Sequence, residues 1–386
     1  MDPFERLPAE LINHIILFAA DFVGIESLLT ASPRVHAVFL DRPGLLLQEL
    51  VASNSISSAA PIQEIIQKVW LLHSPSFNFH SVEEYIQYAE SVHDQPSIYS
   101  DGAEVLQMLH ISAQIQRLAC KCLWTMQQNF ISVVSASPAG RLSGPIRAQK
   151  AAKPFSWVEE SNMHWALWHL RHYSDLHNYA SRLDWPEHSM KKVNEYHIWN
   201  KIKGLTAEVI STVAAVLSDL GLSPIYSYPY LGEHEESIQG VWWYRSETPP
   251  PLFYSFDLEG SMDIAIWPSP PIPSDDIVID AWHLDVSRCG QTPPHLEWYK
   301  NWARIRAYER QIPNYTPLRI QPYRRLGVFI WDVWRMYSTG LIMWNSRPPL
   351  IPAPDWDAEV GELIGLGHVA MVEWHSRWLT LAGTTC

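Results

Sequence analysis

Hydrophobic residues are densest near the start of the chain, in a helix predicted over residues 9–20. Only Asn13 and His14 interrupt the apolar run of this helix. A helix that is apolar nearly all round has to be covered on more than one side. Two short helices, predicted over residues 25–31 and 34–41, can cover one of its faces. The other face is left for the C-terminal body of the chain or for another protein.

Helical periodicity continues well beyond this opening stretch. Apolar residues recur every three or four positions, which predicts a mainly α-helical body. Its helices are expected over residues 45–52, 62–72, 81–93, 102–134, 156–185, 186–203, 205–220, 294–311, 323–339 and 369–381. Residues 135–153 are rich in Ser, Pro, Gly, Arg and Lys and are predicted to form a flexible, exposed loop.

Residues 223–294 differ in composition and hydrophobic pattern from the rest of the body. Prolines cluster in this part of the chain, and three short runs, residues 240–244, 252–256 and 262–267, predict strands of a small sheet or extended loops. Loops on a rigid scaffold often carry binding specificity, so this Pro-rich insertion is one place for a binding surface. It can equally be a cover, stiffened by proline, for the helices.

Composition excludes several classes of protein. The chain has 386 residues, 47 % of them hydrophobic, which supports a real core. A formal net charge of −13 argues against a broad surface for nucleic acid or anionic membranes, since both need a basic field. No apolar stretch reaches the roughly 18 residues that span a bilayer. The 19 tryptophans most simply build an irregular, aromatic-rich core.

The cysteines and the N-terminus both indicate an intracellular location. Four cysteines in a chain of this length give no disulfide framework, which fits a reducing compartment. The first residues lack the basic and apolar regions of a secretory signal. We therefore expect the protein in the cytoplasm, the nucleus or both.

The sequence offers few candidate residues for catalysis, metal binding or cofactor binding. His169 and His172 share one helical face, but no further ligand follows at the spacing of a metalloenzyme. The sequence also lacks a nucleophile elbow and a phosphate-binding loop. We therefore predict a non-catalytic protein with no catalytic, metal or cofactor residues. A small-molecule enzyme that uses the tryptophan-rich body as its pocket stays as the weakest alternative.

The opening residues resemble a known family. The ordered set that carries the resemblance is Leu7-Pro8, Glu10-Leu11, Ile15-Ile16, Asp21, Leu28-Leu29, Ser32 and Arg34. It is similar to an F-box, and the stretches around residues 28–56, 156–159 and 323–341 resemble F-box proteins of filamentous fungi. The fold expected from this is a three-helix F-box-like module, residues 1–42, followed by a mostly helical body, residues 43–386.

The resemblance implies that the module binds the Skp adaptor of a cullin–RING ubiquitin ligase. The positions that match the adaptor-facing pattern are Leu7, Pro8, Leu11, Ile12, Ile15, Leu28 and Val35. The sequence departs from the pattern at Ala19 and Ala20, where a larger aliphatic residue is usual. It also lacks the tryptophan often found in the third helix, which has His36 and Phe39 instead.

Two interpretations of the resemblance stay open. In the first, the chain is the substrate-recognition subunit of an SCF-type ligase, in which the body holds an unknown target protein near the ubiquitin-loading machinery. In the second, it is an F-box-like scaffold or binding protein that does not assemble into a ligase. An exposed apolar face on the first helix would favour a partner.

Overall fold

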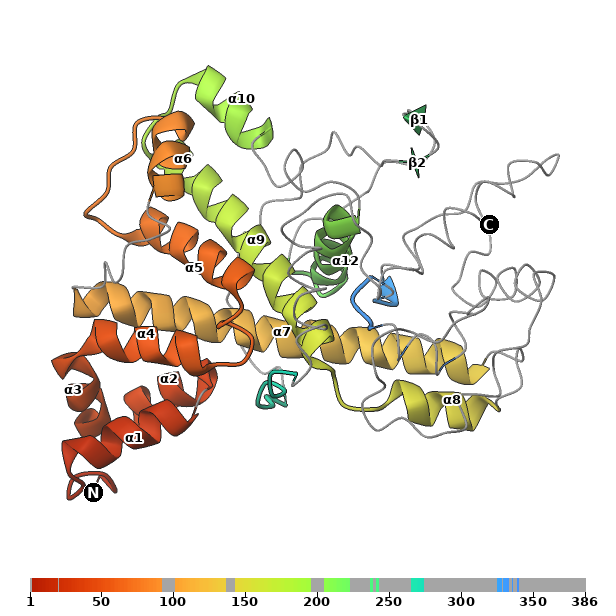
Figure 1. Ribbon diagram of the computed structural model, residues 1–386, viewed down its shortest axis with the longest axis horizontal. Helices are drawn as coiled ribbons and strands as arrows, with labels where there is room; N and C mark the ends of the chain where they lie inside the picture. Colours follow the sequence, from red (N-terminus) through yellow and green to blue (C-terminus); the bar gives the residue numbers. More distant parts are fainter. Residues whose placement is uncertain are drawn as a thin grey trace. The chain divides into compact units, whose positions relative to one another are not determined.

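The computed structural model describes residues 2–19, 21–91, 101–136, 143–195, 205–222, 237–238, 241–242, 265–273, 325–327, 329–332, 335 and 339. Within these ranges the fold is mainly α-helical, as predicted (Figure 1). The helices are α1 (Ala9–Ala19), α2 (Phe22–Ala31), α3 (Pro33–Asp41), α4 (Pro43–Ser53), α5 (Ala60–His73), α6 (Val82–Ser91), α7 (Gly102–Ala136), α8 (Gly144–Ala151), α9 (Trp157–Arg182), α10 (Glu187–Glu195) and α12 (Leu205–Asp219).

Contacts divide the chain into two compact units. The first comprises Met1–Lys121, His164–Ile198 and Leu252–Ile272. The second comprises Cys122–Met163, Trp199–Pro251 and Pro273–Cys386. The boundary between the units therefore falls within two helices. Residues 102–121 of α7 and 164–182 of α9 belong to the first unit, and the remaining residues of both helices belong to the second.

Helices α2 and α3 begin where the sequence provides caps. Asp21 accepts a hydrogen bond from the Val23 N–H at 3.1 Å and so caps α2. Ser32 accepts one from the Val35 N–H, also at 3.1 Å, and Pro33 follows it in the first turn of α3. These side chains satisfy N–H groups that have no partner inside the helix. Each short helix is thus separated from the next by a defined corner.

The module of residues 1–42 is not a separate unit. Helix α4 contacts both α1 and α3, and the four helices lie together in Figure 1. The chain continues from them to Lys121 within the first unit. Residues 1–42 therefore belong to the same unit as α4, which begins at Pro43.

Aromatic side chains fill part of the core of the first unit. They gather around the segment between α5 and α6 and around the end of α9, and the group consists of Phe77, Phe79, Tyr85, Tyr88, Tyr179 and Trp185. Two of them also satisfy backbone groups of this segment, since Tyr179 accepts from the Phe79 N–H at 2.9 Å and Trp185 donates to the Phe79 carbonyl at 2.8 Å. One of the tryptophans, Trp185, is therefore part of an aromatic core here.

One expectation for a less regular segment was wrong. Residues 144–151, inside the predicted flexible loop 135–153, form α8, because Pro145 suits a first turn and Arg147 and Ala151 are buried. Residues 265–267, the end of the run 262–267 for which a strand or an extended loop is predicted, belong to no strand. The reason is the prolines that follow them, which lack an N–H for a sheet ladder.

Little of the predicted β portion can be compared with the structure. A two-residue antiparallel pair, β1 (Ser237–Ile238) with β2 (Val241–Trp242), is what the structure describes there besides residues 265–273. The rest of residues 223–294 lies outside the described residues. So do the helices predicted over 294–311, 323–339 and 369–381, apart from a few positions between 325 and 339.

Candidate protein-docking surface on the first helix

Helix α1 has one buried face and one exposed apolar face. Ile12 and Ile16 are 0 % exposed. Leu11 and Phe18 are 50 % and 86 % exposed, and Ile15 is half-buried. Positions i, i+4 and i+7 lie on the same side of a helix, so Leu11, Ile15 and Phe18 form one stripe. We call it the docking stripe.

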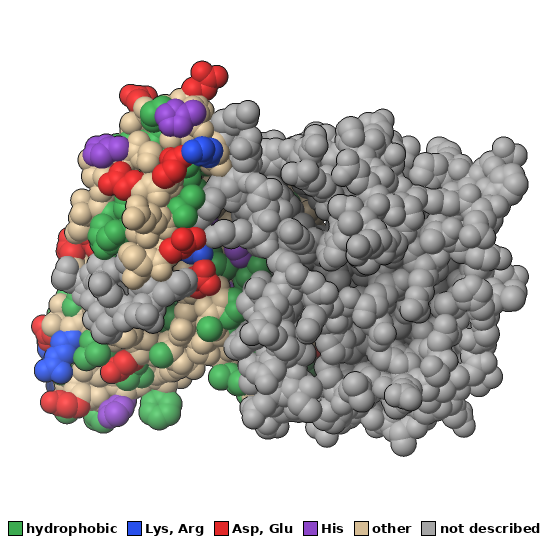
Figure 2. Space-filling model, turned by 45° about the horizontal axis from the view of Figure 1, so that its top comes forward, with side chains coloured by type: hydrophobic (Ala, Val, Ile, Leu, Met, Phe, Trp, Pro, Cys, Tyr) green, Lys and Arg blue, Asp and Glu red, His purple; other side chains and the backbone are tan. Residues whose placement is uncertain are grey.

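The neighbours of α1 leave this stripe uncovered. Helix α1 contacts α2, α3 and α4, which accounts for the burial of Ile12 and Ile16. Figure 2 shows one face of the molecule, on whose described part hydrophobic side chains reach the surface among acidic, basic and histidine side chains. An exposed apolar stripe with an 86 % exposed phenylalanine is a surface that a partner could cover.

The predicted adaptor-facing residues divide into an exposed and a buried set. Pro8 and Leu11 are exposed, Leu7, Ile15 and Leu28 are half-buried, and Ile12 and Val35 are buried. Because Ile12 and Val35 are 0 % and 1 % exposed, they lie in the core and support the surface from beneath. Phe18 was missed by the sequence reasoning. The signal for it was its position seven residues after Leu11.

The two departures from the F-box pattern have different surroundings. Ala19 is half-buried at the end of α1, next to the exposed Phe18. Phe39, which stands near the place of the usual tryptophan, is 0 % exposed and belongs to the core. His36, one turn before it in α3, is half-buried. An aromatic residue in the third helix thus serves here to pack the core.

The N-terminus is fastened to the corner between α2 and α3. Asp2 accepts hydrogen bonds from the Phe4 N–H at 2.9 Å, the Ser32 hydroxyl at 2.6 Å and the Arg34 N–H at 3.1 Å. The bond from Ser32 is the largest cause that lowers the pKa of Asp2, and the backbone bond from Phe4 comes next. The carboxylate thereby ties the residues before α1 to the start of α3.

This corner should weaken in acid. Because the pKa of Asp2 is lower in the folded chain than in the unfolded one, its stabilising effect is present above the unfolded pKa and is lost as the pH falls through the folded pKa. Asp2→Asn removes one acceptor oxygen and should increase amide exchange in the first turn of α3 at neutral pH. The increase should disappear at a pH where Asp2 itself is protonated. An equal increase at both pH values would contradict the assignment.

The second helix is held to α7 by polar contacts. The Val23 N–H donates to the Gln116 side chain at 3.2 Å. Glu26 binds His110 Nδ1 at 2.5 Å through one oxygen and Arg117 through the other. These contacts lie within the first unit, so the helices that support α1 have a fixed place on α7.

A cavity of about 360 Å³ lies beside these contacts. It is lined by Glu26, Leu29, Thr30, Pro33, His36, Leu106, Leu109 and His110. Its one carboxylate, that of Glu26, is already bound by His110 and Arg117. The cavity therefore offers no unpaired charge that would select a ligand.

The histidines of α9 are structural. His172 forms a hydrogen bond with the Tyr85 hydroxyl at 2.6 Å, and burial lowers its pKa to about 3, so the ring is neutral at physiological pH. The ring of His169 packs edge-on against Trp165, with 4.2 Å between the centroids. Within the described ranges, no group of three or more His, Cys, Asp or Glu side chains could hold a metal ion.

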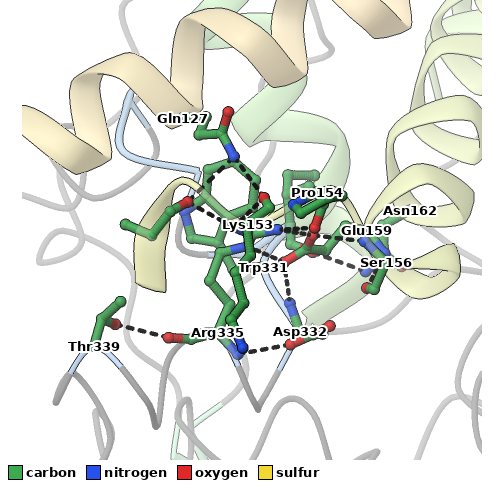
Figure 3. A network of polar contacts seen from close by, with 12 residues as sticks. Gln127, Lys153, Pro154, Ser156, Glu159, Asn162, Trp331, Asp332, Arg335 and Thr339 are labelled. Atoms are coloured by element: carbon green, nitrogen blue, oxygen red, sulfur yellow. Dashed lines mark hydrogen bonds and ion pairs between the residues drawn. The ribbon is translucent and has the colours of Figure 1, made fainter. Parts of the chain in front are cut away.

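The second unit contains a buried ion pair between Glu159 of α9 and Arg335 (Figure 3). The side chains of the pair are 0 % and 3 % exposed. Arg335 Nε lies 2.6 Å from one carboxylate oxygen and Nη2 lies 2.8 Å from the other. Burial raises the pKa of Glu159, and the charge of Arg335 opposes this. The two close bonds from Arg335 favour the ionised form of this carboxylate.

Arg335 also satisfies the backbone after α8. Its Nη1 donates to the carbonyls of Ala151 and Lys153, and its Nη2 donates to that of Pro154. Together with Glu159 these acceptors use all the N–H donors of the guanidinium. No N–H donor of Arg335 is left for a ligand, so this cluster stabilises the fold and is not a binding site.

Comparison with known proteins does not identify the chain. No protein-family model, curated protein or solved structure matches it. In the part of the chain that the structure describes, no helix is both long enough and apolar enough to cross a membrane. The docking stripe on α1 remains the surface with the clearest capacity for a partner.

Proposed function

We propose that this chain is the substrate-recognition subunit of an SCF-type ubiquitin ligase, of the filamentous-fungal F-box type. Helices α1 to α3 bind a Skp-type adaptor, and through it a cullin, while the rest of the chain binds a target protein. The chain performs no bond chemistry. It holds its target close to the ubiquitin-loading machinery in the cytoplasm or nucleus, which raises the effective concentration for transfer.

The observation that carries the proposal is the docking stripe. Leu11 and Phe18 are exposed by 50 % and 86 % on a helix whose opposite face is sealed by its own neighbours. Fully burying a large apolar side chain stabilises a complex by about 1.5–3 kcal/mol, so burying the exposed fractions of these two contributes roughly 2–4 kcal/mol. That is enough for a specific contact when polar rim contacts are added.

A scaffold that does not enter a ligase is the second candidate. Ala19, half-buried beside Phe18, offers less contact area than the larger aliphatic residue that is usual there. At roughly 25 cal/mol per Å² this departure lowers the affinity for an adaptor. The two candidates differ in one measurable property, namely whether a Skp–cullin complex assembles on the chain.

Co-purification with a Skp-type adaptor tests the proposal. The wild-type chain should retain the adaptor, and Leu11→Asp with Ile15→Asp should abolish retention, because two carboxylates would be buried without partners. Leu45→Asp is the matched control, since Leu45 is also 50 % exposed but lies on α4. A folded double variant that binds as well as the wild type would exclude this face. A wild-type chain that binds no adaptor would favour the scaffold.

A further inference from the structure

Residues 265–273 form an extended segment rich in proline. They belong to no helix, strand or turn, and the first unit includes them up to Ile272. Prolines stand at positions 268, 270, 271 and 273. Each fixes its own φ near −65° and keeps the residue before it out of the helical region. Most residues from 267 to 273 are therefore restricted to backbone angles that a polyproline II helix can use.

The exposure of this segment has the period of a polyproline II helix. Ala265, Pro268 and Pro271 are exposed, whereas Ile266, Trp267, Ser269 and Pro270 between them are half-buried. A polyproline II helix has three residues per turn, so positions i, i+3 and i+6 lie along one edge. That edge faces solvent. Ile272, beside Pro271, adds an apolar side chain that is 50 % exposed.

One hydrogen bond fastens the opposite edge to the first unit. The Ser55 hydroxyl, in the connection between α4 and α5, donates to the Pro270 carbonyl at 2.5 Å. The segment is therefore attached to the first unit at Pro270, while its prolines limit its backbone freedom. A ligand already held in its bound conformation loses little entropy when it binds.

We propose that the edge formed by Pro268 and Pro271, with Ile272 beside it, is a docking site for a protein module that binds polyproline II helices. Such modules take prolines at i and i+3 in neighbouring slots between aromatic side chains. Pro268 and Pro271 have this spacing and are both exposed. The inference does not depend on the proposed adaptor binding, which uses α1.

Charge narrows the kind of module. Between Arg245 and Arg288 the sequence contains no lysine or arginine. Three acidic residues stand within a few positions of the segment in the sequence, namely Asp263, Asp275 and Asp276. Modules with an acidic rim, which pair with a basic residue beside the prolines, would be repelled. The partner is therefore a module whose aromatic groove has a basic rim.

Binding of the full-length chain to a panel of purified WW domains and Src homology 3 domains tests this inference. The panel includes acidic and basic groove rims, and fluorescence anisotropy measures the affinities. Domains with a basic rim should bind more tightly, and more weakly at high salt. Pro268→Ala with Pro271→Ala should lower the affinity at least about tenfold, the loss of roughly 1.4 kcal/mol.

The control replaces two exposed prolines elsewhere in the first unit, Pro3→Ala with Pro75→Ala, and should bind like the wild type. If no domain binds, or if the Pro268 and Pro271 variant binds unchanged, the site does not exist. If that variant unfolds at a lower temperature than the wild type, a synthetic peptide of residues 265–273 replaces the full-length chain. The unchanged peptide should bind, and the peptide with the two alanines should bind at least about tenfold more weakly; equal binding would exclude the site. Leu11→Asp with Ile15→Asp should leave this binding unaltered.

Discussion

Glu159→Gln should lower the free energy of unfolding of the second unit by about 3–5 kcal/mol. Glutamine keeps the size of the side chain but leaves the buried Arg335 guanidinium without its counter-ion. Burial removes the water that would otherwise solvate this charge, and Arg335 is only 2 % exposed. Urea denaturation followed by tryptophan fluorescence measures the change, because Trp331 lies 5.3 Å from the guanidinium.

The second unit contains its own control for this variant. Arg325 and Asp219 form an ion pair with an Nε–Oδ2 distance of 2.8 Å, but their side chains are 59 % and 37 % exposed. Solvated pairs contribute about 0–1 kcal/mol, so Asp219→Asn should have little effect. If Glu159→Gln lowers the free energy of unfolding no more than Asp219→Asn does, the buried ion pair does not stabilise the second unit as its geometry indicates.

The same geometry predicts that an apolar pair cannot replace the ion pair. In many proteins such a replacement costs little, because two buried charges are removed together. Here Arg335 also binds the carbonyls of Ala151, Lys153 and Pro154. Gln127 would still donate to the first two carbonyls. Glu159→Leu with Arg335→Met would leave the Pro154 carbonyl without this donor and the Ser156 and Asp332 N–H groups without their acceptor, at roughly 1–3 kcal/mol each. The double variant should therefore stay clearly less stable than the wild type.

Local patterns were enough to predict much of the helical fold. The helix predicted over residues 9–20 is observed as Ala9–Ala19, and the one predicted over 102–134 is observed as Gly102–Ala136. Ser81, the first residue of the helix predicted over residues 81–93, accepts a bond from the Glu84 N–H at 3.3 Å. These features depend on residues a few positions apart, which the sequence shows directly.

Features that depend on distant residues could not be predicted. Glu159 and Arg335 are 176 positions apart, and nothing in either neighbourhood indicates the other. Helix α8 was missed for a related reason, because its buried Arg147 looks like a solvent-exposed residue of a loop. Which side of α1 faces solvent was equally hidden. Ile12 and Phe18 belong to the same apolar run in the sequence. Ile12 is buried and Phe18 exposed because α2 to α4 pack against only one side of α1.

In the proposed complex, Phe18→Ala should weaken adaptor binding about 30-fold. Phe18 is 86 % exposed in the free chain, so almost all of its ring area would be buried by the partner. A loss of about 2 kcal/mol corresponds to this change in affinity. Large aromatic side chains near the centre of an interface commonly carry most of its binding energy. Titration calorimetry with the purified adaptor measures the effect.

The stability of the variant separates docking from folding. Because Phe18 contributes little to the core, Phe18→Ala should unfold at the same temperature as the wild type, whereas Phe39→Ala, at a 0 % exposed position, should not. Leu45→Ala removes an exposed side chain on α4 and should leave adaptor affinity unchanged. Equal affinity of Phe18→Ala and the wild type would restrict the docking face to Leu11 and Ile15. The usual larger residue at the position of Ala19 would then have no aromatic substitute in this chain, and adaptor binding would have to rely on the first turns of α1 alone.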